Sequence, residues 1–273
     1  METKRKKVSA QDVERWVGRW ESSMSSGIYK PWVEVQEVPS RGRSRKVNGV
    51  KSNRIHHFLS DLEYNLYLMF EYDKSITQIK EQYPQLPQTD TVDIANELGI
   101  MHPRYPQSKT PKVGSTDFLI DKLRNDGTVE QIAISAKYEK DFDPNKKTAK
   151  RTLQKLELER LYWAKKGITC KCLTEKSINK NMIYNLKWLI QSAKITSELE
   201  FIKSDWISTY KSSIKNLDGN KLASVLKDAA TSLNISYQDS VQLYKHCMWH
   251  QLLTTDISEK IKLTTPVYFK QYF

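Results

Sequence analysis

The stretch from Ser115 to Lys137 constrains the fold more than any other part of the chain, because it reads as two strands joined by a tight turn. Apolar and polar residues alternate over Thr116–Leu123 and again over Val129–Ala136. Between them, the sequence Asn-Asp-Gly at 125–127 supplies the positive φ that tight hairpin turns need. The sequence therefore predicts a β-hairpin over this stretch.

Polar residues suited to hydrolytic chemistry stand at two corners of this hairpin. Asp117 lies on the first strand, while Ser135 and Lys137 lie two residues apart on the second strand and so share one face. An acid on one strand and an X-x-Lys sequence on its partner is typical of the PD-(D/E)xK nuclease site. In such a site the acid holds a divalent metal against the scissile phosphate. The lysine orients or deprotonates the attacking water and offsets charge in the transition state.

A second carboxylate comes from an earlier segment. The run His56–Glu71 is predicted to be a helix with a wide apolar face, and Glu63 lies at the margin of that face. An unpaired carboxylate there is costly to bury, and a metal ion would offset the cost. Ser60, three residues earlier, allows a second interpretation in which Glu63 completes a capping box. A capping box accepts Gln at position 63, whereas a metal site does not.

The charge of the chain indicates a polyanionic partner. Its 273 residues carry a net charge of +12, with a pI near 9.4. A soluble basic protein without a nucleic-acid role is the alternative. The densest basic run contains no acid and is a candidate DNA-phosphate clamp, although a solvated loop would have the same composition. Its six cationic residues are Arg41, Arg43, Arg45, Lys46, Lys51 and Arg54. The basic loop 102–113 allows the same two interpretations.

Other carboxylates near the hairpin have competing interpretations. Glu139, Asp141 and Asp143 alternate after the second strand and are expected in a solvated loop. Glu159 lies on the predicted helix Thr152–Lys166. It could support the site by orienting Lys137 or a metal-bound water, or it could pair with Lys155 four residues earlier.

The remaining pattern predicts an α/β protein with two domains. Residues 1–176 are expected to form a mixed sheet flanked by helices, and residues 177–273 a mainly α-helical domain ending in two alternating runs. Helix, turn, helix and hairpin is a winged-helix pattern, although such a domain could also serve packing or protein docking. Besides the segments above, we expect helices at Ala10–Glu21, Thr91–Leu98, Asn179–Lys194, Glu198–Lys211, Leu217–Leu233 (with Asp218 as N-cap) and Tyr237–Leu253, strands at Trp32–Val38 and Ile168–Leu173, and an extended segment or turn at Ile76–Gln88.

Cysteine content and hydropathy bear on the compartment. Cys170, Cys172 and Cys247 are few and odd in number, which favours reduced thiols, and no zinc-binding pattern accompanies them. We expect Cys170 and Cys172 to be buried in a strand. No apolar run is long enough to cross a bilayer. We therefore expect a cytoplasmic, bacterial protein that is associated with the nucleoid when bound to DNA.

Five segments of the chain resemble the TnsA family, the endonuclease subunits of Tn-seven-type heteromeric transposases. They are WVEVQEVPSRGRSRK at 32–46, HHFLSDLE at 56–63, EQYPQLP at 81–87, STDFLID at 115–121 and LQKLELERLYW at 153–163. The resemblance runs in order through residues 30–175. The C-terminal part is similar in pattern more than in letters.

The resemblance implies a restriction-endonuclease-like domain followed by a winged-helix domain. It further implies a Mg²⁺-dependent cut, with Mn²⁺ as an alternative, in the non-transferred strand at the 5′ ends of the element. A TnsB-like transposase would cut the 3′ ends, and a TnsC-like AAA+ ATPase would regulate the complex. The family's catalytic residues fall on Glu63, Asp117 and Lys137. Where the family has Gln two residues before the lysine, this chain has Ser135, whose hydroxyl or backbone carbonyl would have to replace that metal ligand. A non-catalytic DNA-binding adaptor with a nuclease-like scaffold is the alternative function.

Overall fold

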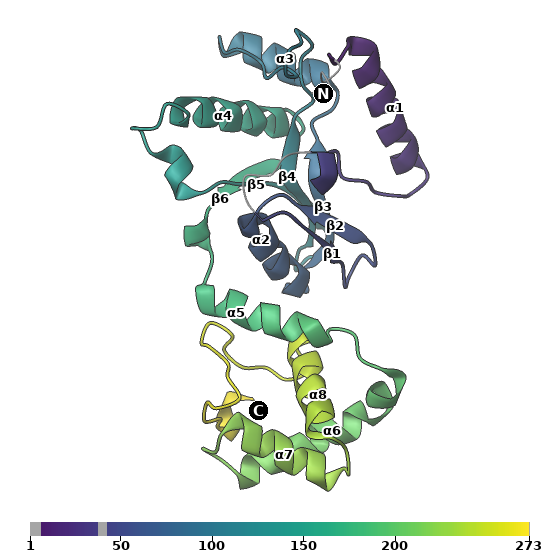
Figure 1. Ribbon diagram of the computed structural model, residues 1–273, viewed down its shortest axis with the longest axis vertical. Helices are drawn as coiled ribbons and strands as arrows, with labels where there is room; N and C mark the ends of the chain where they lie inside the picture. Colours follow the sequence, from purple (N-terminus) through teal and green to yellow (C-terminus); the bar gives the residue numbers. More distant parts are fainter. Residues whose placement is uncertain (1–6, 38–42, 273) are drawn as a thin grey trace, which may run out of the picture. The chain divides into compact units, whose positions relative to one another are not determined.

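The computed structural model describes residues 7–37 and 43–272, which leaves Arg41 outside the described residues (Figure 1). The chain divides into two compact units, Met1–Ser177 and Ile178–Phe273. Among the described residues, no helix is both long enough and apolar enough to cross a membrane.

The first unit is built on a four-stranded mixed sheet with the strand order β3-β4-β5-β6. The strands are β3 Ile76–Pro84, β4 Ser115–Leu123, β5 Val129–Ala136 and β6 Thr169–Leu173. The first three are antiparallel, and β6 runs parallel to β5. A parallel neighbour requires a crossover, which helix α4 (Ala149–Lys165) supplies. The predicted mixed sheet is confirmed.

The hairpin predicted over Ser115–Lys137 is confirmed as β4 and β5. Its register runs from Leu123 opposite Val129 to Phe118 opposite Ile134, and Gly127 has a φ of 83° in the turn. A side chain at position 127 would be strained, which explains the Asp-Gly sequence. The hairpin's open end carries Asp117 on one strand and Ser135 to Lys137 at the end of the other.

Helices cover both faces of this sheet (Figure 1). On one face, α3 (Gln88–Glu97) and α4 contribute Ile94, Leu158 and Trp163 to a buried cluster with Leu119 and Ala133 of the sheet. On the other face, Phe118 contacts the ring of Phe70 in α2 (Asp61–Tyr72) at a centroid distance of 5.3 Å. Phe118 and Leu119 are consecutive strand residues and so point to opposite faces, which places α2 opposite α4.

The predicted helix from His56 begins later than expected. Residues Ile55–Phe58 form strand β2, which pairs with β1 (Arg45–Asn48), and α2 begins only at Asp61. Ser60 is the N-cap, in extended conformation, and its hydroxyl accepts the Glu63 backbone N–H. The β-branched and aromatic residues before Ser60 therefore pair as a strand.

Two further segments near the N-terminus differ from expectation. The strand expected at Trp32–Val38 is wrong: Val35–Glu37 forms a 3-10 turn, in which the Glu37 carboxylate accepts the Glu34 backbone N–H at 2.9 Å (Val38 lies outside the described residues). Ile76–Gln88 is a strand as far as Pro84. Helix α1 (Ala10–Ser25) is confirmed and extends one turn beyond its predicted end.

The second unit is helical. Its helices are α5 Lys180–Leu189, α6 Ser197–Asn216, α7 Leu222–Ser232 and α8 Tyr237–Trp249. Trp206 and Tyr210 of α6 stack at 5.1 Å and pack with Tyr244 of α8 in the buried core. The prediction that Asp218 is the N-cap of α7 is wrong. Lys221 holds that position, and the Asp218 carboxylate accepts the Phe269 backbone N–H instead.

The winged-helix prediction for this unit is not confirmed. Among the described residues after α8, no strand forms, although an isolated bridge joins Lys221 and Pro266. The tail bonds to the segment between α6 and α7: Val267 donates to Asn220 O and accepts from Gly219 N, both at 2.9 Å. The alternating residues of the tail thus find backbone partners elsewhere and do not pair with each other as a wing.

The three cysteines are free. Cys247 is buried in α8, whereas Cys170 is half-buried and Cys172 is exposed on β6. The expectation that both strand cysteines are buried is therefore wrong, because β6 is the edge strand of the sheet.

Candidate active site

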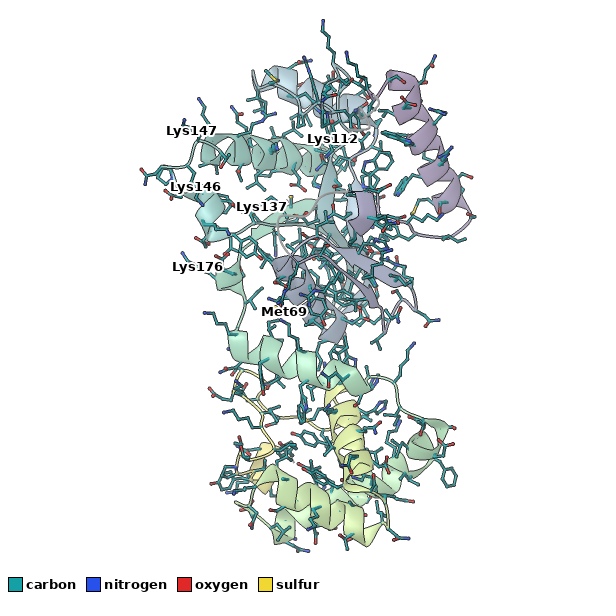
Figure 2. All side chains as sticks on the ribbon, viewed as in Figure 1. Met69, Lys112, Lys137, Lys146, Lys147 and Lys176 are labelled. Carbon is teal, nitrogen blue, oxygen red and sulfur yellow. The ribbon has the colours of Figure 1, made fainter. Side chains whose placement is uncertain are left out.

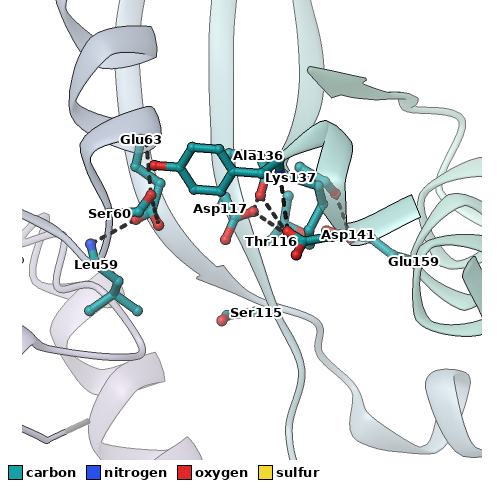
Figure 3. A network of polar contacts seen from close by, with 12 residues as sticks. Leu59, Ser60, Glu63, Ser115, Thr116, Asp117, Ala136, Lys137, Asp141 and Glu159 are labelled. Carbon is teal, nitrogen blue, oxygen red and sulfur yellow. Dashed lines mark hydrogen bonds and ion pairs between the residues drawn. The ribbon is translucent and has the colours of Figure 1, made fainter. Parts of the chain in front are cut away.

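Asp117 lies where the ladder between β4 and β5 ends. Its Oδ2 accepts the backbone N–H of Ala136 at 2.7 Å and a hydrogen bond from Lys137 Nζ at 2.8 Å (Figure 3). Lys137 Nζ also donates to the carbonyl oxygen of Ala136 at 2.9 Å. The Asp117 carboxylate thus accepts the backbone N–H that a strand carbonyl would otherwise accept, and it holds the Lys137 side chain beside it.

Glu63 approaches the same place from the first turn of α2. It is buried, and its carboxylate accepts the Leu59 backbone N–H at 2.9 Å and the Ser60 hydroxyl at 2.8 Å (Figure 3). The two interpretations of Glu63 are therefore compatible, since one side chain both caps the helix and faces the sheet. The capping contacts hold the carboxylate in place.

Gln82 of β3 joins the two acids. Its Nε2 lies 3.3 Å from Glu63 Oε2 and 3.4 Å from Asp117 Oδ1, and the Ser115 hydroxyl donates to its Oε1 at 2.9 Å. Gln82 is buried and has a φ of 49°, in the left-handed region that non-glycine residues rarely occupy. Such strained residues cluster at functional sites. We did not predict Gln82, whose only sequence signal is its place in the EQYPQLP segment.

The site carries more negative charge than its neighbours neutralise. Burial, reinforced by the charge of Asp117, raises the pKa of Glu63 to about 7, against the hydrogen bonds from Leu59 and Ser60 and the charge of Lys137. Burial lowers the pKa of Lys137, but the carboxylates of Asp117 and Glu159 outweigh it and leave that pKa above its ordinary value. Lys137 is therefore a cation at neutral pH, while Glu63 lies near its midpoint.

Ser135 and Glu159 form the inner wall of the site. The Ser135 hydroxyl donates to Glu159 Oε2 at 2.5 Å, and both residues are buried. Burial and the charge of Asp117 raise the pKa of Glu159, which Lys137 opposes. Among the described residues, Glu159 makes no ion pair with Lys155. Of the two interpretations of Glu159, the structure favours the one in which it supports Lys137, because its carboxylate bonds to Ser135 and its charge acts on Lys137.

The donor set suits a hard cation. Within residues 7–37 and 43–272, no three His, Cys, Asp or Glu side chains are grouped as a metal site. Two carboxylates do converge on one Gln82 nitrogen, and the charge of Asp117 opposes the ionisation of Glu63. Mg²⁺ is commonly held by one or two carboxylates together with waters and substrate phosphates. The oxygen donors of Glu63 and Asp117 therefore fit Mg²⁺ or Mn²⁺ and do not fit a thiophilic metal.

Other acids in and near the hairpin lie in separate contacts. Asp121 pairs with Lys80 at 3.0 Å, and Glu139 pairs with Lys176 at 2.9 Å. Asp141 accepts the backbone N–H of Tyr138. None of these carboxylates has a described contact with Glu63 or Asp117.

Half of the predicted DNA clamp is used inside the chain. Arg45 pairs with Asp61 and lies 4.3 Å above the ring of Tyr64. Lys51 Nζ donates to three backbone carbonyls, at Phe70, Asp73 and Ile76. Arg54 Nη1 bonds to Glu81 Oε1 at 2.8 Å. Arg43 and Lys46 are exposed. A phosphate-binding role for this run stays a prediction, now best carried by these last two residues.

Comparison with known proteins shows which proteins this chain resembles. Residues 73–175 match the family model for the TnsA-like endonuclease N terminal. The chain is also 43% identical over 173 residues to the transposon Tn7 transposition protein TnsA of Escherichia coli. That match covers 63% of this chain and 60% of the relative, so the chain spans less than two thirds of the relative's length. Glu63 precedes the residues of the family match, whereas Asp117, Lys137 and Glu159 lie within them. Residues 73–175 are therefore similar to the TnsA-like endonuclease N-terminal domain, and this segment contains Asp117, Lys137 and Glu159 of the candidate active site.

Proposed function

We propose that the protein is a metal-dependent endodeoxyribonuclease of cut-and-paste transposition. It cuts the non-transferred strand at the 5′ ends of a mobile element, together with a TnsB-like transposase and a TnsC-like AAA+ regulator. One observation carries the proposal: Glu63 of α2 and Asp117 of β4 converge on Gln82, while Lys137 bonds to Asp117. The family match and the charge of +12 support DNA as the substrate.

In this proposal Glu63 and Asp117 hold the cation. A bound Mg²⁺ or Mn²⁺ supplies polarisation of the phosphodiester and lowers the pKa of a coordinated water. The Ser135 hydroxyl is engaged by Glu159, so a ligand from this strand would be a backbone carbonyl and not the Ser135 side chain.

Lys137 places positive charge next to the reacting phosphate. Because its pKa is raised, it stays protonated at neutral pH and is a poor proton acceptor. We therefore assign it to orienting the attacking water and stabilising negative charge in the transition state. Glu159, on the far side of Ser135, supports this position by keeping Lys137 charged.

A strand-specific nicking assay tests the proposal. Element-end DNA is incubated with Mg²⁺, the partner transposase and the regulator, and each 5′ end is mapped. We expect wild type to cut and Asp117→Ala to leave the non-transferred strand intact. Asp121→Ala is the matched control, since Asp121 lies on the same strand but pairs with Lys80. Wild-type protein that never cuts, or Asp117→Ala that cuts normally, would instead support the non-catalytic adaptor.

A further inference from the structure

Helix α4 carries a line of charges that leads away from the candidate active site. Arg151, Lys155 and Glu159 are four residues apart, so they lie on one side of the helix in successive turns. Each step advances about 6 Å along the helix axis. Glu159 ends this line inside the site, where it accepts the Ser135 hydroxyl. Lys155 and Arg151 thus continue the line toward the exposed N-terminal part of α4.

The loop before β4 adds a further cation to this line. Arg151 Nη2 donates to the carbonyl oxygen of Met101 at 2.5 Å, which fastens the loop to α4. The Lys112 backbone N–H donates to Pro103 O at 2.8 Å and keeps the loop folded back on itself. After burial, the charges of Arg151, Lys112 and Lys137 lower the pKa of Lys155. The loop contacts of Met101 and Pro103 thus bring Lys112 toward Arg151 on α4, and the effect of the two charges on Lys155 agrees with this placement (Lys112 is labelled in Figure 2).

Three of these cations lack a carboxylate partner. In the part of the chain that the structure describes, no acid pairs with Lys112, Arg151 or Lys155, and both lysines are exposed. The far part of α4 is different, because Arg160 pairs with Glu157, and Lys165 and Lys166 both pair with Asp90. Arg151 and Lys155 are like charges in successive turns of α4, an arrangement that destabilises a helix and that a bound anion would relieve.

We propose that Lys112, Arg151 and Lys155 bind the backbone phosphates of the DNA next to the scissile bond. This inference rests on the proposed nuclease function and says which surface holds the substrate. Lys112 and Lys155 are exposed and have no carboxylate partner among the described residues, so they can exchange their counterions for phosphates at little cost, and the half-exposed Arg151 adds its charge beside them while it bonds to Met101 O. The run Arg43–Arg54 is denser in sequence but is half consumed by internal contacts. The phosphate-binding surface therefore lies along α4 and the preceding loop.

A salt-dependence measurement tests this surface separately from cleavage. The full chain with Asp117→Asn, which removes cleavage, is titrated onto element-end duplex DNA by fluorescence anisotropy at several salt concentrations. The triple variant Lys112→Gln, Arg151→Gln, Lys155→Gln should bind more weakly. The magnitude of its negative slope of log K against log salt should fall by about 2 to 3, close to 0.9 for each phosphate that the variant no longer neutralises.

A control with equal charge excludes a general electrostatic effect. Arg160→Gln, Lys165→Gln, Lys166→Gln removes two charges from the C-terminal part of the same helix and one from its C-cap residue, and should leave the slope near that of the parent. Because Arg151 also fastens the loop, the double variant Lys112→Gln, Lys155→Gln is measured as well and should retain a reduction of about 2.

The outcomes separate the two proposals. Equal losses in both triple variants, or an unchanged slope in the Lys112 and Lys155 variants, would overturn the phosphate-binding surface. A wild-type protein that fails to cut with its partners present would overturn the nuclease proposal and leave the binding result standing. Reduced binding and a reduced slope confined to the Lys112, Arg151 and Lys155 variants would support the surface.

Discussion

Two neighbouring residues of β3 reach into two buried polar clusters that are neutralised differently. Glu81 is fully buried and bonds to Arg54 at 2.8 Å and to His56 Nδ1 at 2.9 Å. Burial alone would raise its pKa, but Arg54 and His56 outweigh burial and leave that pKa below its ordinary value. Gln82, the next residue, contacts Glu63 and Asp117, and there the pKa of Glu63 is raised to about 7.

The difference distinguishes a structural carboxylate from one prepared for a ligand. The Glu81 cluster contains its own counter-charge, so its ionised form is stable in the folded chain. The Glu63 cluster has two acids that share Lys137 and a neutral amide, so ionisation of Glu63 is unfavourable, and in the proposed nuclease a bound cation would supply the missing positive charge. The basic residues show the same difference. Arg54 forms an ion pair with Glu81, whereas Lys112 and Lys155 have no carboxylate partner among the described residues.

Removing Asp117 should have the largest effect on activity. We expect Asp117→Asn to lower the cleavage rate by at least about 10³-fold, because it removes a cation ligand and the partner of Lys137. The free energy of unfolding should change by no more than about 1 kcal/mol, since Asn can still accept the Ala136 N–H. Single-turnover cleavage and denaturant unfolding measure the two effects. A variant that keeps half the wild-type rate would contradict the role of Asp117.

Glu81→Gln should show the opposite pattern. It leaves the half-buried Arg54 without its counter-charge; removing one partner of a fully buried ion pair costs about 3–5 kcal/mol, and we expect a loss of stability toward the lower end of that range because Arg54 is partly exposed. The cleavage rate of the molecules that remain folded should be unchanged. Unfolding in urea and the activity of the folded fraction check this. If Glu81→Gln lost cleavage while keeping its stability, the two clusters would not differ as described.

The pH dependence of stability should come from Glu63. Its pKa in the folded chain lies above the unfolded value of 4.5, so the fold binds more protons between these limits. The metal-free protein should therefore be most stable below pH 4.5 with respect to this group and lose about 1–3 kcal/mol as the pH rises to 7. Thermal unfolding across this range measures the loss. In Glu63→Gln the loss of stability between pH 4.5 and 7 should disappear. An unchanged stability profile in this variant would contradict the assignment of that loss to Glu63.

Gln82→Met should have the smallest effect. Methionine keeps the length of the side chain but removes both donors to the acids, and each neutral hydrogen bond is worth about 1 kcal/mol. We expect cation affinity and cleavage to fall roughly 5- to 10-fold, because the carboxylates lose the group that positions them. The matched variant Gln78→Met changes an exposed residue of the same strand and should have no effect. Equal effects of the two variants would remove the positioning role from Gln82.

The sequence predicted the parts of the site that depend on local signals. Alternation and an Asp-Gly turn located the hairpin, and with it Asp117 and Lys137. The role of Gln82 was not predicted, because tertiary packing imposes its left-handed backbone and no local sequence pattern indicates it. The wing was wrong for a related reason, since alternating residues do not reveal that the α6–α7 segment supplies their backbone partners. Composition likewise could not show that the Lys51 ammonium donates to three backbone carbonyls of the chain.

Proton release on cation binding tests the distinction between the two clusters most directly. Calorimetric titration of the metal-free protein with Mn²⁺ at pH 6, in buffers of different ionisation enthalpy, gives the number of protons released. With the pKa of Glu63 near 7, we predict about one proton for each ion bound. Glu81→Gln should release the same number and Glu63→Gln almost none. Binding without proton release, or equal release from Glu63→Gln, would contradict a cation held by Glu63 and Asp117.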